Sequence, residues 1–236
     1  MECIVELTNM KIGKNMKTVL VLCFLVLFVV SMSSAELLTT ANSIGKGKFV
    51  GLGTWIQDSN VSNNKDYKGT CFGGYVGYGL IDQLDILFGV GSVTLSGLPS
   101  GFESSIIGYG PMLKYTLITE GENFPISVAV GGGYKLLSKK VKIAGLGEIT
   151  TDGSQRLLGV GVSKLVIPFV PYTGVLYRNI SGTIGDSYQI DITLGTAIAW
   201  SMQGAVLVEY THQLITPSVG TNYSSGQFAV SLAYTI

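Results

Sequence analysis

Hydrophobic side chains alternate with small or polar ones along several segments of this chain. In the first segment Phe72, Val76 and Leu80 fall on one face, and Cys71 and small residues such as glycine fall on the other. A β-strand points successive side chains to opposite faces, so this period of two is typical of strands with one apolar face. The clearest segments are 70–80, 126–136, 188–195 and 227–236.

The same reading along the whole chain predicts ten strands. The first and sixth alternate weakly, and Lys46 and Lys48 fit either face of the first, so eight or twelve strands stay open as alternatives. The predicted strands are residues 43–57, 68–81, 84–95, 104–118, 124–137, 154–165, 168–179, 186–197, 201–212 and 223–236.

The connections between these strands alternate between short and longer polar ones. This alternation is typical of transmembrane β-barrels, in which short turns lie on one side of the membrane and longer loops on the other. The short connections are 82–83, 119–123, 166–168 and 198–200, and the longer ones are 58–67, 96–103, 138–153, 180–185 and 213–222.

Composition decides which way the apolar faces point. Charged residues are only 13% of the 236 residues, the formal net charge is zero, and mean hydropathy is +0.44. These values exclude a disordered chain and disfavour a nucleic-acid-binding protein, which needs a basic face. They also disfavour an ordinary soluble enzyme domain, whose water-facing surface needs more charge. We therefore predict an all-β, antiparallel, up-and-down transmembrane β-barrel with apolar residues toward lipid and small or polar residues toward the lumen.

The first 35 residues have the features of a secretory signal peptide. Three lysines precede a twelve-residue apolar run, Val19 to Val30, and Ser33 and Ala35 occupy the −3 and −1 positions of a cleavage site. The run is short for a membrane-spanning helix, which needs about 20 apolar residues. We expect cleavage after Ala35, with Met16 as a possible start, and a barrel domain at residues 36–236.

One segment carries a resemblance to a known class. Residues 77–86, Gly-Tyr-Gly-Leu-Ile-Asp-Gln-Leu-Asp-Ile, resemble the strand–turn–strand of small bacterial outer-membrane β-barrel proteins. The last strand, with Tyr234 and Ile236 on its apolar face, is similar to the C-terminal strand that the outer-membrane assembly machinery reads, although it ends in Ile and not Phe. The resemblance implies a bacterial outer-membrane location, with membrane lipid and the assembly machinery as partners, and specifies no subfamily.

Residues that carry catalysis are scarce. The dinucleotide-binding, P-loop, zinc-protease and serine-hydrolase motifs are absent from the sequence. The only histidine is His212, and Tyr210 stands two residues before it, where an outer-membrane protease of the omptin type has Asp. Pairing of His212 with Ser218, Ser224 or Ser225 is the remaining hydrolase hypothesis. After signal removal Cys71 is the only cysteine, so we expect no intramolecular disulfide, metal or cofactor.

Charged residues within the predicted strands offer a candidate site. Their side chains are predicted to point into the lumen or to lie near its mouth, where buried charges need partners. Three acids and three bases suggest salt bridges across the lumen that fill the interior, and the alternative is a narrow water-filled pore. The six residues are Asp85, Lys114, Lys135, Arg178, Asp191 and Glu209. Tyr75 is predicted to fill the lumen, and the other strand tyrosines to form two aromatic girdles.

Lysines cluster at the base of the longest predicted loop. Lys139, Lys140 and Lys142 lie where they could meet lipid phosphates, or form a solvated shoulder of the loop. Together these features predict a non-enzymatic outer-membrane barrel with a structural or surface-loop interaction role and a lumen plugged by side chains. A narrow porin-like channel is the first alternative, and a hydrolase built on His212 is the second.

Overall fold

The computed structural model describes residues 40–59, 68–96, 102–144, 147–183, 186–217 and 223–236. The predicted signal segment 1–35 lies outside these residues. The described chain forms ten β-strands, in agreement with the predicted number. They are β1 (Phe49–Ser59), β2 (Lys68–Ile81), β3 (Leu84–Ser96), β4 (Phe102–Ile118), β5 (Ser127–Ile143), β6 (Gly147–Ser163), β7 (Phe169–Gly182), β8 (Ser187–Ala199), β9 (Gly204–Pro217) and β10 (Tyr223–Thr235).

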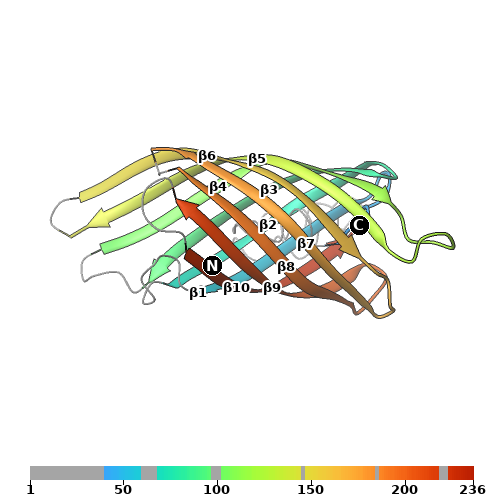
Figure 1. Cartoon of the computed structure of the whole chain (residues 1–236). Coiled ribbons are helices and arrows are strands. Elements are labelled where there is room, and N and C mark those ends of the chain that lie inside the picture. Colours follow the sequence, from blue (N-terminus) through green and yellow to red (C-terminus); the bar gives the residue numbers. More distant parts are fainter. Residues whose placement is uncertain (1–39, 60–67, 97–101, 145–146, 184–185, 218–222) are drawn as a thin grey trace, which may run out of the picture.

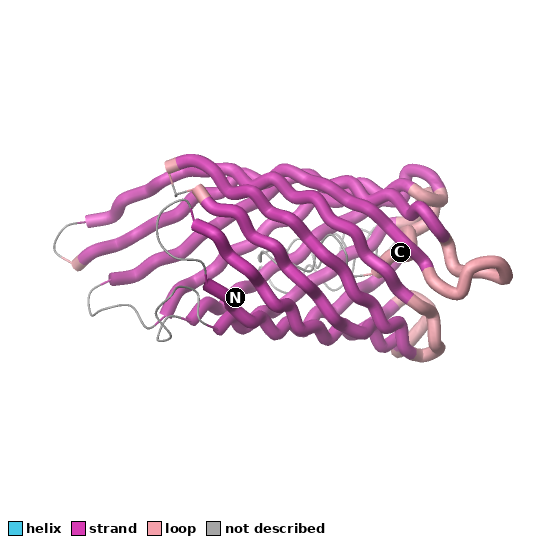
Figure 2. Tube along the Cα trace, in the orientation of Figure 1, coloured by secondary structure: helices cyan, strands magenta, loops and turns pink. Residues whose placement is uncertain are grey.

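The strands close into one antiparallel barrel. Each strand pairs with its neighbours in sequence, and β1 pairs with β10 to complete the ring (Figure 1). The tube in Figure 2 shows strands joined by turns and loops throughout the described part. This confirms the predicted fold class. Among the described residues no helix is long and apolar enough to cross a membrane.

The two ends of the barrel differ. At one end, here called the turn end, β2 and β3 are joined by Asp82 and Gln83, and Phe49 and Ile236 exchange backbone hydrogen bonds of 3.0 and 2.8 Å. The connections 119–126, 164–168 and 200–203 also lie at this end, on the right of Figure 1. The opposite end, the loop end, holds the other ends of the strands, where Ser59 lies opposite Lys68 and Ile143 opposite Gly147.

The wall is apolar on the outside and polar on much of the inside. In β8 the outward Ile190, Ile192 and Leu194 are 42%, 47% and 67% exposed, whereas the intervening Asp191 and Thr193 are buried. The period of two continues around the barrel, because a pleated strand cannot place two successive side chains on one face. The inversion relative to a soluble barrel is the one that the low charge content predicts.

Aromatic side chains lie outside the wall near the turn end and again further along the strands. At the turn end Phe49 and Tyr78 pack with ring centroids 4.6 Å apart, and the Tyr234 hydroxyl donates to Gln203 Oε1 at 2.6 Å. Further along, Tyr177 and Tyr188 stack at 6.3 Å. Tyr75 is buried and points inward, as predicted, and Tyr172, which the sequence places in a girdle, is buried inside as well.

Three predicted boundaries are wrong, one of them at residues 213–217, which are expected in a loop but belong to β9. Residues 43–48 were expected to begin the first strand, but β1 starts at Phe49. Residues 138–153 were expected to form the longest loop, but β5 and β6 pair continuously out to Ile143 and Gly147. Lys139, Lys140 and Lys142 therefore lie in β5 and not at a loop base. A strand tolerates these lysines because their side chains stay exposed while the backbone of residues 138–143 pairs with β6.

Candidate functional site in the barrel lumen

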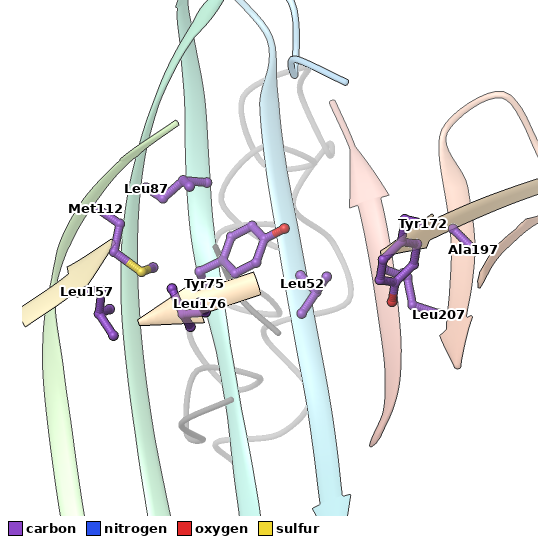
Figure 3. Packing of buried hydrophobic residues seen from close by; sticks show 9 residues of the cluster. All are labelled: Leu52, Tyr75, Leu87, Met112, Leu157, Tyr172, Leu176, Ala197 and Leu207. Carbon is purple, nitrogen blue, oxygen red and sulfur yellow. The ribbon is translucent and has the colours of Figure 1, made fainter. Parts of the chain in front are cut away.

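An apolar layer crosses the lumen nearer the turn end than the loop end. Its members come from eight of the ten strands, point inward from the wall and form one buried apolar cluster (Figure 3). Ile44 packs against the layer from the turn-end side. The layer consists of Leu52, Tyr75, Leu87, Met112, Leu157, Tyr172, Leu176, Ala197 and Leu207.

Below this layer, residues Thr40–Lys48 form a strap across the turn end of the lumen. The backbone of Ala41 donates to Ser163 Oγ of β6 at 3.1 Å and accepts from Thr116 Oγ1 of β4 at 3.0 Å. Gly47 donates its backbone N–H to the carbonyl oxygen of Gly79 in β2 at 2.8 Å. The strap is thus tied to opposite parts of the wall before the chain enters β1.

A buried ion pair holds the middle of the strap. Lys114 Nζ lies 3.2 Å from Asp85 Oδ2 and donates to the carbonyl oxygens of Asn42 and Thr40 at 2.7 and 3.4 Å. Asp85 Oδ1 accepts from Ser43 Oγ at 2.7 Å and from the backbone N–H of Ile44 at 3.1 Å. Asp85 is fully buried, so its charge is compensated by Lys114 and by donors from the strap.

The strap fits because the wall facing it is made of glycine. A Cβ on Gly79 would overlap the carbonyl oxygen of Gly45, and one on Gly77 would meet Ile44 Cδ1 at 2.7 Å. Gly45 and Gly47 in the strap have φ of 89° and 77°, which a residue with a side chain adopts only with strain. The glycines that the sequence analysis placed on the small face of β2 therefore make room for the strap.

Gly79→Val is expected to displace the strap while the barrel still folds. The new side chain clashes with backbone, which cannot rotate away, and such overpacking destabilises by about 1–3 kcal/mol. Hydrogen exchange of the Ile44 and Gly47 amides should accelerate. Gly121→Val is the matched control, because a Cβ at Gly121 meets nothing within 4 Å. Unchanged exchange in Gly79→Val would contradict the fit described here.

A second buried ion pair lies on the opposite side of the lumen. The Arg178 guanidinium of β7 contacts the carboxylate of Asp191 in β8, and Gln189 Nε2 donates to Asp191 Oδ1 at 2.6 Å. Asp191 is fully buried, and the Arg178 side chain is 11% exposed. This cluster fixes two neighbouring strands to each other from inside.

Glu209 of β9 is held by hydroxyl groups. Its Oε2 accepts from the Tyr172 hydroxyl at 3.0 Å, and its Oε1 accepts from Thr211 Oγ1 at 3.2 Å. Thr211 in turn lies 2.9 Å from Thr193 of β8, oxygen to oxygen. Glu209 thus connects the apolar layer, through Tyr172, to the polar wall above it.

The structure places all six predicted charges inside the wall, and Lys135 is 2% exposed. It brings them together differently from the expectation. Asp85 and Lys114 are direct partners in the register of β3 and β4, and the Arg178–Asp191 pair joins β7 to β8. Both ion pairs therefore link neighbouring strands and do not cross the lumen, because adjacent strands bring side chains closer than opposite walls do.

The strap was missed by the sequence analysis, although one signal pointed to it. Residues 43–48 alternate weakly, and Lys46 and Lys48 fit either face of a strand. Residues outside the barrel wall need not alternate between apolar and small or polar side chains as the wall strands do. Ser43 and Ile44, the strap residues that contact Asp85, carry no motif of their own.

His212 is separated from the lumen. The inward residues on either side of it, Thr211 and Gln213, are buried, and His212 lies on the outward row. Ser225 points inward and is 2% exposed, so the wall stands between it and His212. Ser224 is exposed and lies on the outward row, as His212 does, and Ser218 lies outside the described residues. Within the described part, no group of three or more His, Cys, Asp or Glu residues could hold a metal ion.

The lysines of β5 form ion pairs outside the barrel body. Lys140 Nζ lies 3.1 Å from Glu148 Oε1, and Lys142 Nζ lies 3.6 Å from Glu103 Oε2. All four side chains are about half exposed or more. Cys71 is buried and packs with Ile56 and Ala229 on the lumen side.

No protein-family model matches the chain, and no curated protein matches its sequence. Solved β-barrels are similar to it in fold. The β domain of the Bordetella autotransporter BrkA is 15% identical over 80% of this chain and 98% of its own, with a TM-score of 0.49. The Escherichia coli outer-membrane protease OmpT is 12% identical over 80% and 96%, with a TM-score of 0.44. The Pseudomonas aeruginosa outer-membrane protein OprG is 12% identical over 82% and 98%, with a TM-score of 0.41.

Proposed function

We propose that this chain is a non-enzymatic β-barrel protein of the bacterial outer membrane, with a closed lumen and a role carried by its structure and its loop-end surface. Membrane lipid surrounds the barrel, and the assembly machinery reads β10 during insertion. The turn end faces the periplasm, and the loop end faces the outside. The headgroup contact of Lys139, Lys140 and Lys142 remains a prediction, and two of these lysines have Glu103 and Glu148 as alternative partners.

The observation that carries the membrane location is the inverted burial of the wall. Bulky apolar side chains such as Leu158 and Leu194 are 64% and 67% exposed, while Asp85 and Asp191 are fully buried inside. In water such an exterior would drive aggregation, whereas a closed barrel in lipid satisfies its backbone and buries its apolar surface. The outward Phe228, Leu232 and Tyr234 of β10 support insertion by its last strand.

The observation that supports closure is that two separate barriers lie in series. The strap crosses the turn end, the apolar layer lies behind it, and Ile44 of the strap packs against the layer. In a barrel of about this strand number, side chains are large enough relative to the lumen to fill it. Solvated ions passing such a layer would lose their hydration without compensating ligands.

Refolded protein in planar bilayers tests the closure. We expect no reproducible single-channel steps, together with heat-modifiable migration in detergent gels that reports the folded barrel. Regular conductance steps that change in Asp191→Asn or Lys135→Met would overturn the closed lumen and favour the narrow channel. Solubility without detergent after signal removal would overturn the membrane location. Hydrolysis of lipid or peptide that His212→Ala abolishes would overturn the non-enzymatic role.

A further inference from the structure

The loop end of the barrel carries a sheet edge that stands above the closed wall. β6 pairs with β5 along its whole length, from Ser163 to Gly147, but it pairs with β7 only from Ser163 to Gly153. Residues 147–152 of β6 therefore have a strand on one side only. Together with residues 138–143 of β5 they form the β5–β6 extension, which lies beside residues 102–107 of β4 and continues past the end of β7, at the left of Figure 1.

The end of β7 fixes where the closed wall stops. Asp152 donates its backbone N–H to Thr183 Oγ1 at 3.0 Å and accepts from the Thr183 N–H at 3.0 Å. Gly182 turns there with φ of 126° and donates to Asp186 Oδ1 at 3.1 Å. The chain turns back toward β8 at this corner, so within the described residues no strand continues along the rest of β6.

The position of Asp152 also fixes which backbone groups are exposed at the edge. Its N–H and C=O point toward β7, and in an extended strand these groups alternate from side to side. Those of Thr150 and Glu148 therefore point the same way, to the side where the described chain has no strand, whereas those of Ile149 and Thr151 point to β5. Edges of this kind are usually protected by lysine, proline or a bulge. Residues 147–152, Gly-Glu-Ile-Thr-Thr-Asp, contain neither residue type, and their register with β5 is regular.

The pairing of β5 with β6 shows which residue types lie opposite residues 147–152 in this protein. On the inner side of β6, Lys142 stands opposite Glu148, Val141 opposite Ile149 and Lys140 opposite Thr150. The edge strand itself carries two acids, Glu148, which pairs with Lys140 of β5, and Asp152, together with Ile149, 56% of whose surface is exposed. A second copy cannot supply this complement, because its own residues 138–143 already lie between β4 and β6.

We propose that residues 147–152 of β6 are a docking edge for an extended, lysine-containing segment of a partner protein, which adds as a further strand. Main-chain hydrogen bonds to Thr150 and Glu148 supply the binding, and lysines opposite the acids with a β-branched residue opposite Ile149 supply the selectivity. This proposal deepens the surface role proposed above and is independent of whether the lumen conducts.

Binding of a labelled peptide, Ser-Lys-Lys-Val-Lys-Ile, to the full-length barrel in micelles tests the proposal by fluorescence anisotropy. We expect saturable binding that falls about tenfold or more in Thr150→Pro. Proline removes an N–H that points to the open side, so the ladder with β5 stays intact. Thr150→Val keeps the N–H and is expected to bind within about twofold of the parent protein. Heat-modifiable migration checks that both variants fold.

Two further measurements separate strand addition from simple charge attraction. The peptide Ser-Lys-Lys-Pro-Lys-Ile has the same charge but cannot form the ladder, and it should fail to bind. Hydrogen exchange should show the Thr150 amide becoming protected when the first peptide binds, while Ile149 is protected throughout. Absent binding, equal binding of both peptides, or equal binding to Thr150→Pro and Thr150→Val would overturn the docking edge. None of these results bears on the bilayer conductance, so the two proposals fail separately.

Discussion

Lys114→Met is expected to destabilise the folded barrel by about 3–5 kcal/mol, because it leaves the fully buried Asp85 carboxylate without its counter-charge. The same change removes the donor that Nζ supplies to the carbonyl oxygens of Asn42 and Thr40. Two effects should therefore appear together: earlier loss of heat-modifiable migration in urea, and faster hydrogen exchange in the strap.

The double variant Asp85→Asn with Lys114→Met separates charge from shape. It removes both members of the pair, so the uncompensated charge disappears and much of the lost stability should return. Lys164→Met is the control, since Lys164 is exposed at the turn end and should change stability by less than about 0.5 kcal/mol. Equal stability of Lys114→Met and Lys164→Met would show that the pair does not hold the strap.

The sequence predicts the strands of the barrel wall well because successive side chains of a strand alternate between lipid and lumen. In β2 every inward residue from Cys71 to Gly79 was assigned from alternation alone, and the strand has the predicted bounds, Lys68–Ile81. The two-residue turn at Asp82 and Gln83 follows from the same segment. These features depend on neighbours in sequence, and period two reports them directly.

What the sequence does not predict depends on contacts between distant segments. Whether Asp191 meets Arg178 or another base depends on the register of β7 against β8, which the intervening turn sets and alternation does not encode. The strap depends on Asp85, more than forty residues away, accepting from Ser43. Lys139, Lys140 and Lys142 suggest a loop where the β5–β6 extension stands, because charge distinguishes water from lipid and not strand from loop.

The strap and the apolar layer lie in series, so we expect conductance only when both are altered in the same variant. Deletion of residues 40–46 opens the turn end but leaves the apolar layer. The double substitution Tyr75→Ala with Met112→Ala thins the layer but leaves the strap. Because barriers in series each suffice to block passage, each variant alone should stay silent in planar bilayers. Only the combined variant is expected to show reproducible conductance steps.

The stability of the double variant has to be measured alongside its conductance, because the two substituted residues are buried. Tyr75 is 7% exposed and Met112 is 1% exposed. Truncating a buried side chain of this size destabilises by about 2–5 kcal/mol, so the double substitution should unfold at lower urea while keeping a heat-modifiable band. Phe72→Ala is the matched control, because Phe72 neighbours Tyr75 on β2 but points outward with 54% exposure. If the strap deletion alone conducts, the apolar layer does not seal the lumen. If the combined variant stays silent, the seal lies elsewhere, and the polar rows around Asp191 and Glu209 become the place to look.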